Sequence, residues 1–160
     1  MATECFKIDW TGYYSFNKAK SRPEARKLGL YAIYKPTFDE RILLYVGKAT
    51  DIGTRLNQHK QALQRLYSPE ELNEVQIAIG VLTSLDGKSV NQGQLKDVES
   101  LFINKYKPER NAPSTKRGYT GRSALVVSTG KTGRFNKLTT HDKALLILIK
   151  DSIISDYDLY

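Results

Sequence analysis

The sequence predicts an α+β protein with a small three-stranded antiparallel sheet flanked by helices, followed by a C-terminal extension that is basic and helical. Three segments rich in β-branched and aromatic residues are predicted strands, and the first two are separated by a short loop. Two longer segments with apolar residues at helical spacing flank the third strand, which favours α+β over a repeating βαβ pattern. The length of 160 residues indicates one domain, spanning 1–160, with its own core.

The first two predicted strands are Leu28 to Lys35 and Ile42 to Lys48. Pro36 and Asp39 between them are typical of a loop, so the two strands are predicted to form a hairpin. The third predicted strand, Val75 to Leu82, is apolar enough to lie at the centre of a sheet.

The first predicted helix begins after Asp51, a residue type that caps helix N-termini, and runs to about Tyr67. The second runs from Leu95 to Tyr106 and ends before Pro108, because the residue before a proline disfavours the helical conformation. Apolar residues recur at helical spacing in both segments, so each helix is expected to pack one face on the sheet.

Two segments lie outside these elements. Residues 1–28 contain a cluster of aromatic side chains that we expect to cover the core, and residues 112–160 form the C-terminal extension. The extension includes a short strand candidate, Ala124 to Ser128, and a helix from His141 to about Ser155. Apolar residues occupy more than one face of that helix, which is typical of a helix that is either buried or shared with a second subunit.

Glu99 is predicted to point from the second helix toward the core. At about 100° per residue, it falls within the arc formed by Leu95, Phe102 and Tyr106. A carboxylate in such a place is costly unless it is paired, hydrogen-bonded or bound to a metal. Glu99 is therefore a partner in a structural ion pair or a metal ligand at the floor of an active site.

The first helix places Arg55 and His59 beside its apolar stripe, four residues apart and so on one face. A single histidine there is more often a core residue. An arginine and a histidine together, with Glu99 on another helix, indicate a phosphate site built from a cation, a carboxylate and a proton acceptor. In the hairpin, Tyr31 and Tyr45 each lie two residues from a glycine, either as ordinary sheet tyrosines or as part of this site.

The positive charge is concentrated in one segment. The net charge is +8 and the pI about 9.5, which favours a polyanionic partner, nucleic acid before an anionic membrane surface. Between 105 and 137 the only acid is Glu109, and Tyr119 offers a ring for stacking or a hydroxyl for a phosphate. This segment is the candidate for contacts with nucleic acid, and its basic residues are Lys105, Lys107, Arg110, Lys116, Arg117, Arg122, Lys131, Arg134 and Lys137.

The composition also bears on location. Cys5 is the only cysteine, so a disulfide framework or a cysteine zinc site within one chain is excluded. The N-terminus has no apolar signal-peptide segment, and the longest apolar run, Ala144 to Ile149, is too short to span a bilayer. We expect an intracellular, cytoplasmic protein that is not bound in a membrane.

The chain resembles the GIY-YIG nuclease family over residues 29–111. The matching residues, in the order of the family signature, are Gly29-Leu30-Tyr31, Tyr45-Val46-Gly47-Lys48, Arg55, Glu99 and Asn111. Leu30 and Val46 replace isoleucines of the signature and leave its tyrosines in place. His59, four residues after Arg55, is similar to the pattern in the restriction endonucleases of the family.

The resemblance implies a phosphodiesterase that cleaves double-stranded DNA. Carried over to this chain, it makes Glu99 the ligand of one Mg²⁺ or Mn²⁺, a hard cation that suits carboxylate, water and phosphate oxygens. Arg55 would stabilise charge on the phosphate. Asn111 would hold the Glu99 region or touch the phosphate. The water-activating group would be one of four residues: Tyr31, Tyr45, Lys48 or His59, of which neutral His59 fits best by its intrinsic pKa.

Within this class, His59, the compact chain and the basic segment favour a sequence-specific type II restriction endonuclease. The alternatives are a repair or mobile-element nuclease and a catalytically silent nucleic-acid-binding module. A restriction enzyme that cuts both strands of a palindrome calls for two sites, so a homodimer is expected, with Ala144 to Ile154 as its contact. Arg117, Tyr119 and Arg122 are candidates for reading bases.

Overall fold

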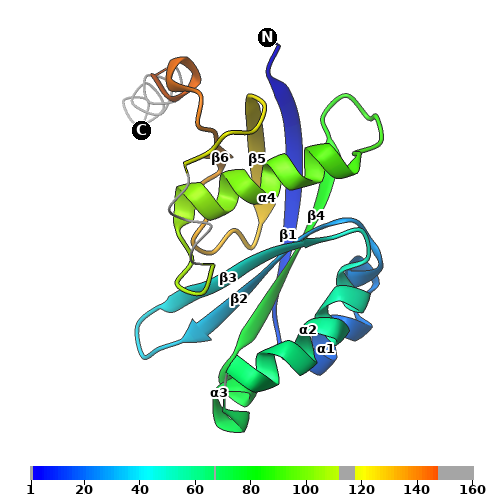
Figure 1. The fold of residues 1–160 in the computed structure, drawn as a ribbon, viewed down its shortest axis with the longest axis vertical. Helices are drawn as coiled ribbons and strands as arrows, with labels where there is room; N and C mark the ends of the chain where they lie inside the picture. The colour runs from blue at the N-terminus through cyan, green and yellow to red at the C-terminus, as the bar shows by residue number, and fades with distance from the viewer. Residues whose placement is uncertain (1, 67, 112–117, 148–160) are drawn as a thin grey trace.

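A computed structural model describes residues 2–66, 68–111 and 118–147 (Figure 1). The elements in chain order are β1 (Glu4–Tyr14), α1 (Phe16–Ser21), the 3-10 helix η1 (Pro23–Arg26), β2 (Gly29–Pro36), β3 (Arg41–Ala49), α2 (Ile52–Leu66), α3 (Pro69–Glu74), β4 (Gln76–Ser84), α4 (Gln92–Tyr106), β5 (Ala124–Gly130) and β6 (Leu138–Thr139). All six strands form one curled, mixed sheet in the order β3-β2-β4-β1-β5-β6. Helices α1 and α2 lie on one face, and α4 crosses the other.

The α+β class is confirmed, but the predicted three-stranded antiparallel sheet is wrong. The three predicted strands are present as β2, β3 and β4, and they are antiparallel neighbours. However, β1 pairs antiparallel with β4 and parallel with β5, which makes the sheet larger and mixed. Without β1, the edge of β4 would expose a row of unpaired backbone groups. Residues 1–28, expected to cover the core, thus supply a strand inside the sheet.

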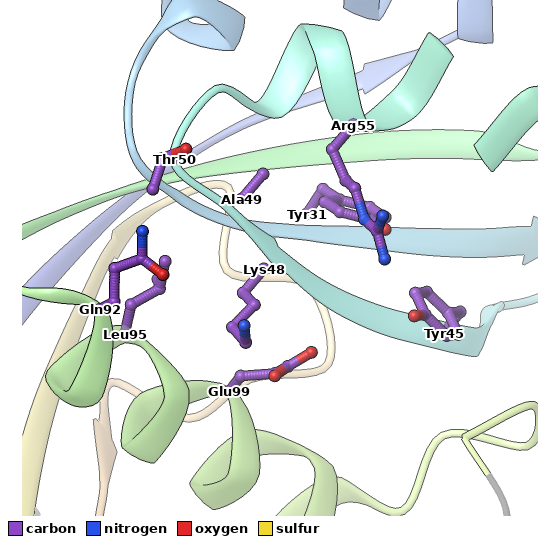
Figure 2. Close-up of a pocket in the computed structure, with 9 residues that line it drawn as sticks. All are labelled: Tyr31, Tyr45, Lys48, Ala49, Thr50, Arg55, Gln92, Leu95 and Glu99. Atoms are coloured by element: carbon purple, nitrogen blue, oxygen red, sulfur yellow. The ribbon is translucent and has the colours of Figure 1, made fainter. Parts of the chain in front are cut away.

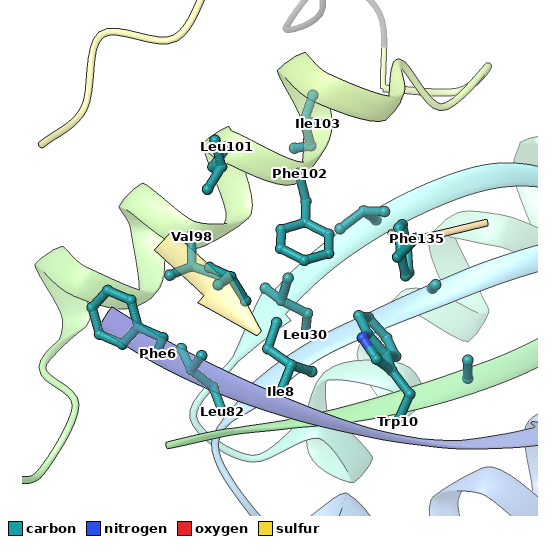
Figure 3. Close-up of a cluster of buried hydrophobic side chains, with 14 of the residues drawn as sticks. Phe6, Ile8, Trp10, Leu30, Leu82, Val98, Leu101, Phe102, Ile103 and Phe135 are labelled. Atoms are coloured by element: carbon teal, nitrogen blue, oxygen red, sulfur yellow. The ribbon is translucent and has the colours of Figure 1, made fainter. Parts of the chain in front are cut away.

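Each face of the sheet has its own apolar core. On the α4 face, strand residues such as Ile8, Trp10 and Leu30 pack against Val98 and Phe102 of the helix (Figure 3). On the other face, the α1 and α2 side chains pack against β2, β3 and β4. Burial of both faces anchors α2 and α4 on opposite sides of the same strands.

The two helices that carry the predicted site residues begin at capped N-termini. The Asp51 side chain accepts a hydrogen bond from the Thr54 amide at 2.9 Å, which confirms the predicted start of α2. Helix α4 begins three residues before the predicted start, because Asn91 and Gln94 form a reciprocal capping box. It ends at Tyr106, as predicted.

The C-terminal extension is described only in part. The strand candidate is confirmed as β5, and residues 143–147 are helical. Most of the predicted dimer segment lies outside the described residues, so the dimer contact stays a prediction. Of the helices in the described ranges, none has the length and apolar character that a bilayer span requires.

Candidate active site

A pocket of about 330 Å³ opens at the edge of the sheet, around strand β3. Its lining residues are Tyr31, Tyr45, Lys48, Ala49, Thr50, Arg55, Gln92, Leu95 and Glu99. Figure 2 shows α2 and α4 reaching it from opposite sides of β3. Because β3 is the first strand of the sheet order, side chains from helices on both faces meet around its edge.

The alternation of β3 divides the site between the two faces. Val46 packs in the core on the α4 side, whereas Tyr45 packs against the core on the α2 side. Lys48 has the parity of Val46, and in Figure 2 it points toward Glu99 of α4. The structure therefore brings the predicted cations and the predicted carboxylate together in one pocket.

Tyr31 is fully buried, and its hydroxyl group lies 3.1 Å from Nδ1 of His59, within hydrogen-bond distance. The ring centroids of Tyr31, Tyr45 and His59 are 5.6 to 6.0 Å apart, so the three rings form one cluster. Burial raises the pKa of Tyr31 and lowers that of His59, which the Arg55 charge lowers further. At neutral pH the pair is a protonated phenol and a neutral imidazole.

Gly47 makes room for this cluster. A Cβ atom on Gly47 would lie 2.5 Å from both Cζ and Oη of Tyr31 and 2.8 Å from a ring carbon of Tyr45. Any larger residue at this position therefore displaces the Tyr31 ring. The displacement costs stability, because the ring is fully buried.

Gly47→Ala is therefore expected to separate the Tyr31 hydroxyl group from His59 while leaving the fold intact. In this variant the pH titration of His59, followed by NMR, should differ from that of the wild type. The midpoint of thermal unfolding should fall by a few degrees. Gly118→Ala is the matched control, because a Cβ there meets no atom within 4 Å. An unchanged His59 titration in Gly47→Ala would contradict the assigned packing.

Glu99 is half-buried and faces the pocket, instead of pointing into the apolar core as predicted. Burial raises its pKa, and the positive charges of Lys48 and Arg55 oppose that rise. The same carboxylate raises the pKa of Tyr45, after the larger effect of burial. In the described ranges Glu99 forms no ion pair within 4.0 Å, so the first of its two predicted roles, partner in a structural ion pair, has no support there.

Asn111 lies behind β3 and not in the pocket. Its side-chain oxygen accepts from the Val46 amide at 2.9 Å, and its side-chain nitrogen donates to the Val46 carbonyl at 3.0 Å. Asn111 thus satisfies both backbone groups of Val46 on the open edge of β3. The Arg110 amide donates a hydrogen bond to the Leu44 carbonyl on the same edge, at 2.8 Å. Asn111 fixes the strand between Tyr45 and Gly47, and is a positioning residue.

The donor set fits a hard divalent cation that takes most of its ligands from elsewhere. Among the residues that the structure describes, no three side chains of His, Cys, Asp and Glu come together to hold a metal. Glu99 alone offers a carboxylate in the pocket. A cation of the Mg²⁺ type commonly keeps several waters and uses one or two carboxylates with substrate phosphate oxygens.

Several residues of the predicted DNA-contacting segment are engaged within the fold. Arg122 forms ion pairs with Asp97 at 2.7 Å and Glu4 at 3.6 Å. Lys131 donates to the Gly12 carbonyl at 3.0 Å, and Arg134 lies 3.9 Å from Glu40.

Of the other predicted contacts, Tyr119 donates a hydrogen bond to the Arg122 carbonyl and stacks on His141. Lys105 is half-buried, Lys107 and Arg110 are exposed, and Lys116 and Arg117 lie outside the described residues. None of the seven that the structure describes lines the pocket.

Sequence reasoning did not identify Thr50 and Gln92 as pocket residues. Thr50 directly follows β3, so its place after Lys48 could have suggested it. Gln92 occupies the first turn of α4, one turn before the predicted helix start, and carried no signal.

Comparisons of the chain with protein-family models, curated proteins and solved structures found no match. The class of the protein is accordingly set by its fold and pocket: an α+β protein with a curled six-stranded sheet and one carboxylate among cations at the sheet edge.

Proposed function

We propose that this protein is a metal-dependent endonuclease that hydrolyses phosphodiester bonds in double-stranded DNA. The observation that carries the proposal is the convergence of Arg55, Lys48 and Glu99 on one pocket beside a hydrogen-bonded tyrosine and histidine. These groups match the needs of phosphoryl chemistry: charge stabilisation, a metal ligand and a proton acceptor. The resemblance to the GIY-YIG nucleases supports the same assignment.

The scissile phosphate is assigned to the space between Arg55 and Glu99. Arg55 is exposed at the mouth of the pocket, where its guanidinium group can bind two phosphate oxygens. Lys48 adds a second positive charge from the opposite side of β3. Glu99 would hold Mg²⁺ or Mn²⁺, which when bound supplies positive charge next to the phosphate and lowers the pKa of water.

We place the attacking water next to the Tyr31 hydroxyl group. With His59 carrying its proton on Nε2, Nδ1 accepts the Tyr31 hydrogen, so Tyr31 can accept a proton from water as it passes its own to His59. The raised pKa of Tyr31 disfavours a free phenolate, and the lowered pKa of His59 keeps the acceptor neutral. His59 is therefore the final proton acceptor, and Tyr31 the group next to the water.

This relay predicts how cleavage depends on pH. The rate should rise as His59 loses its proton, with a midpoint below the ordinary histidine pKa of 6.5, because burial and Arg55 lower that pKa. His59→Ala and Tyr31→Phe should each lose about a hundredfold in rate, and His59→Ala should also lose this pH dependence.

Single-turnover rates from about pH 5 to about pH 9 test the relay. Tyr34→Phe is the control, because Tyr34 belongs to the same strand but packs in the core on the α4 side. A wild-type pH profile in His59→Ala would overturn the relay and leave Tyr31 or Tyr45 as the base.

Within the nucleases, we favour a sequence-specific restriction endonuclease, because His59 lies within hydrogen-bond distance of Tyr31 and matches the histidine in the pattern of the family's restriction endonucleases. A repair or mobile-element nuclease is the alternative, and the distribution of product ends separates the two. Homodimer formation and an intracellular location belong to the same proposal.

A further inference from the structure

Helices α1 and α2 pack together on one face of the sheet (Figure 1), and η1 contacts both of them. Ala19 and Ala25 are buried in the same core as Ile52 of α2. Lys20 donates a hydrogen bond to Asn57 of α2 at 3.4 Å, which joins the outer sides of the two helices. The segment before β2 is thus a fixed neighbour of the helix that carries Arg55.

This unit has an excess of positive charge that is not neutralised within the fold. Between residues 16 and 27 there are five basic residues and one acid, Glu24, and α2 contains no acid. Glu24 is paired with Arg22 at 3.3 Å. Lys18, Arg26 and Lys27 are exposed, and within the described ranges none of the three has an ion pair within 4.0 Å.

Asp51 caps the N-terminus of α2 and so borders this unit. Further acidic residues lie in other elements. Helix α3 carries Glu70, Glu71 and Glu74, and the β2–β3 loop carries Asp39 and Glu40. Cations thus outnumber acids on α1, η1 and α2, even with Glu24 and Asp51 counted, and an excess of positive charge attracts a polyanion and steers its approach.

The surface is continuous with the pocket. Lys27 lies two residues before Gly29, and Gly29 pairs with Ala49, which lines the pocket. On the other side of the unit, Arg55 of α2 reaches into the same pocket. A duplex with one phosphate in the pocket can therefore follow α2 onto η1 and α1.

We propose that the α1–η1–α2 surface binds the phosphate backbone of double-stranded DNA that flanks the scissile phosphate. The surface is formed by Lys18, Lys20, Arg26, Lys27 and Lys60. The inference rests on the proposed function, and it places the main backbone contact outside the segment from 105 to 137. Contacts of this kind position the duplex and carry no sequence information.

The test replaces Lys18, Arg26 and Lys27 together by glutamine and measures binding of a short DNA duplex in EDTA as the salt concentration rises. The log–log slope should become shallower by about 2.7, since each lost phosphate contact contributes about 0.9. The charge-matched control replaces Lys7, Lys35 and Lys143, which are exposed on other parts of the fold. Lys35 shares a second pocket with Glu71 and Glu109, so it is a poor phosphate ligand. The control slope should equal that of the wild type.

Lysine acetylation of the unaltered protein, read by mass spectrometry, tests the surface without any substitution. DNA should protect Lys18 and Lys27 and leave Lys7 and Lys143 reactive. An unchanged slope in the triple variant or equal protection at all four lysines overturns the surface. Because both measurements exclude metal, a protein that binds as described but cleaves no DNA overturns the nuclease proposal instead.

Discussion

Glu99→Gln is expected to abolish DNA cleavage, with a loss of about a thousandfold or more, while duplex binding stays within about twofold of the wild type. Glutamine keeps the size of the side chain but removes the negative charge that the metal needs. Glu99 contributes little to the core, since it is half-buried at the pocket, so the variant should fold. Single-turnover cleavage in Mg²⁺ and fluorescence anisotropy of a labelled duplex measure the two effects.

Glu109→Gln is the matched control, because Glu109 is an exposed carboxylate outside the pocket. It should cleave at the wild-type rate. The metal itself gives a second readout, since Mn²⁺ bound to the protein should broaden NMR signals of the pocket in the wild type and not in Glu99→Gln. Robust cleavage by a folded Glu99→Gln protein would remove Glu99 as the metal ligand.

Arg55→Ala should lower the cleavage rate by about 10² to 10³, the usual effect of removing one group that stabilises transition-state charge. Lysine at this position should restore only part of the rate, because an ammonium group cannot bind two phosphate oxygens in the planar geometry of arginine. Arg55 is exposed, so its loss should leave the unfolding free energy nearly unchanged. The effect should appear in the single-turnover rate at saturating protein.

Gln58→Ala, an exposed substitution on the same helix, controls for changes in α2 itself. It should match the wild type in rate and stability. If Arg55→Ala cleaved as fast as Gln58→Ala, the phosphate would have to lie elsewhere in the pocket, nearer Lys48.

The hairpin and the β4 strand were predictable because their signals are local. β2 and β3 are dense in β-branched and aromatic residues and are joined by a short loop, and the middle of β4 is apolar. Strand β1 also has a local signal that went unused, since Phe6, Ile8 and Trp10 are buried in alternation with exposed residues. Its partners could not be predicted, because β4 and β5 are far away in the sequence.

The candidate site was predictable as a set of residues, but not in its geometry. Helical spacing brought out Arg55, His59 and Glu99, yet it placed Glu99 in the core. The helix face identified by spacing is wider than the apolar core beneath the helix. At the edge of the sheet, part of that face borders a pocket instead of the core. The role of Gly47 depends on the packing of the Tyr31 ring against it, which no pattern in the chain reveals.

Charge counting along the sequence does not show which cations are engaged within the fold. The segment from 105 to 137 is the most basic in the sequence, but the partners of Arg122 are Asp97 and Glu4, both distant along the chain. The cations of α1 and η1 are fewer and give a weaker signal in the sequence, although the fold leaves Lys18, Arg26 and Lys27 exposed. A positive net charge favours a polyanionic partner, and the fold decides which cations are available to bind one.

Metal-dependent hydrolysis of DNA is tested most directly by incubating the purified protein with supercoiled plasmid in Mg²⁺ or in EDTA and sequencing the product ends. We expect cleavage in Mg²⁺ and none in EDTA, with ends that share one short symmetric motif. Ends at branches or lesions would identify the repair alternative. Plasmid that stays supercoiled at every concentration of Mg²⁺ and Mn²⁺ would contradict the claim.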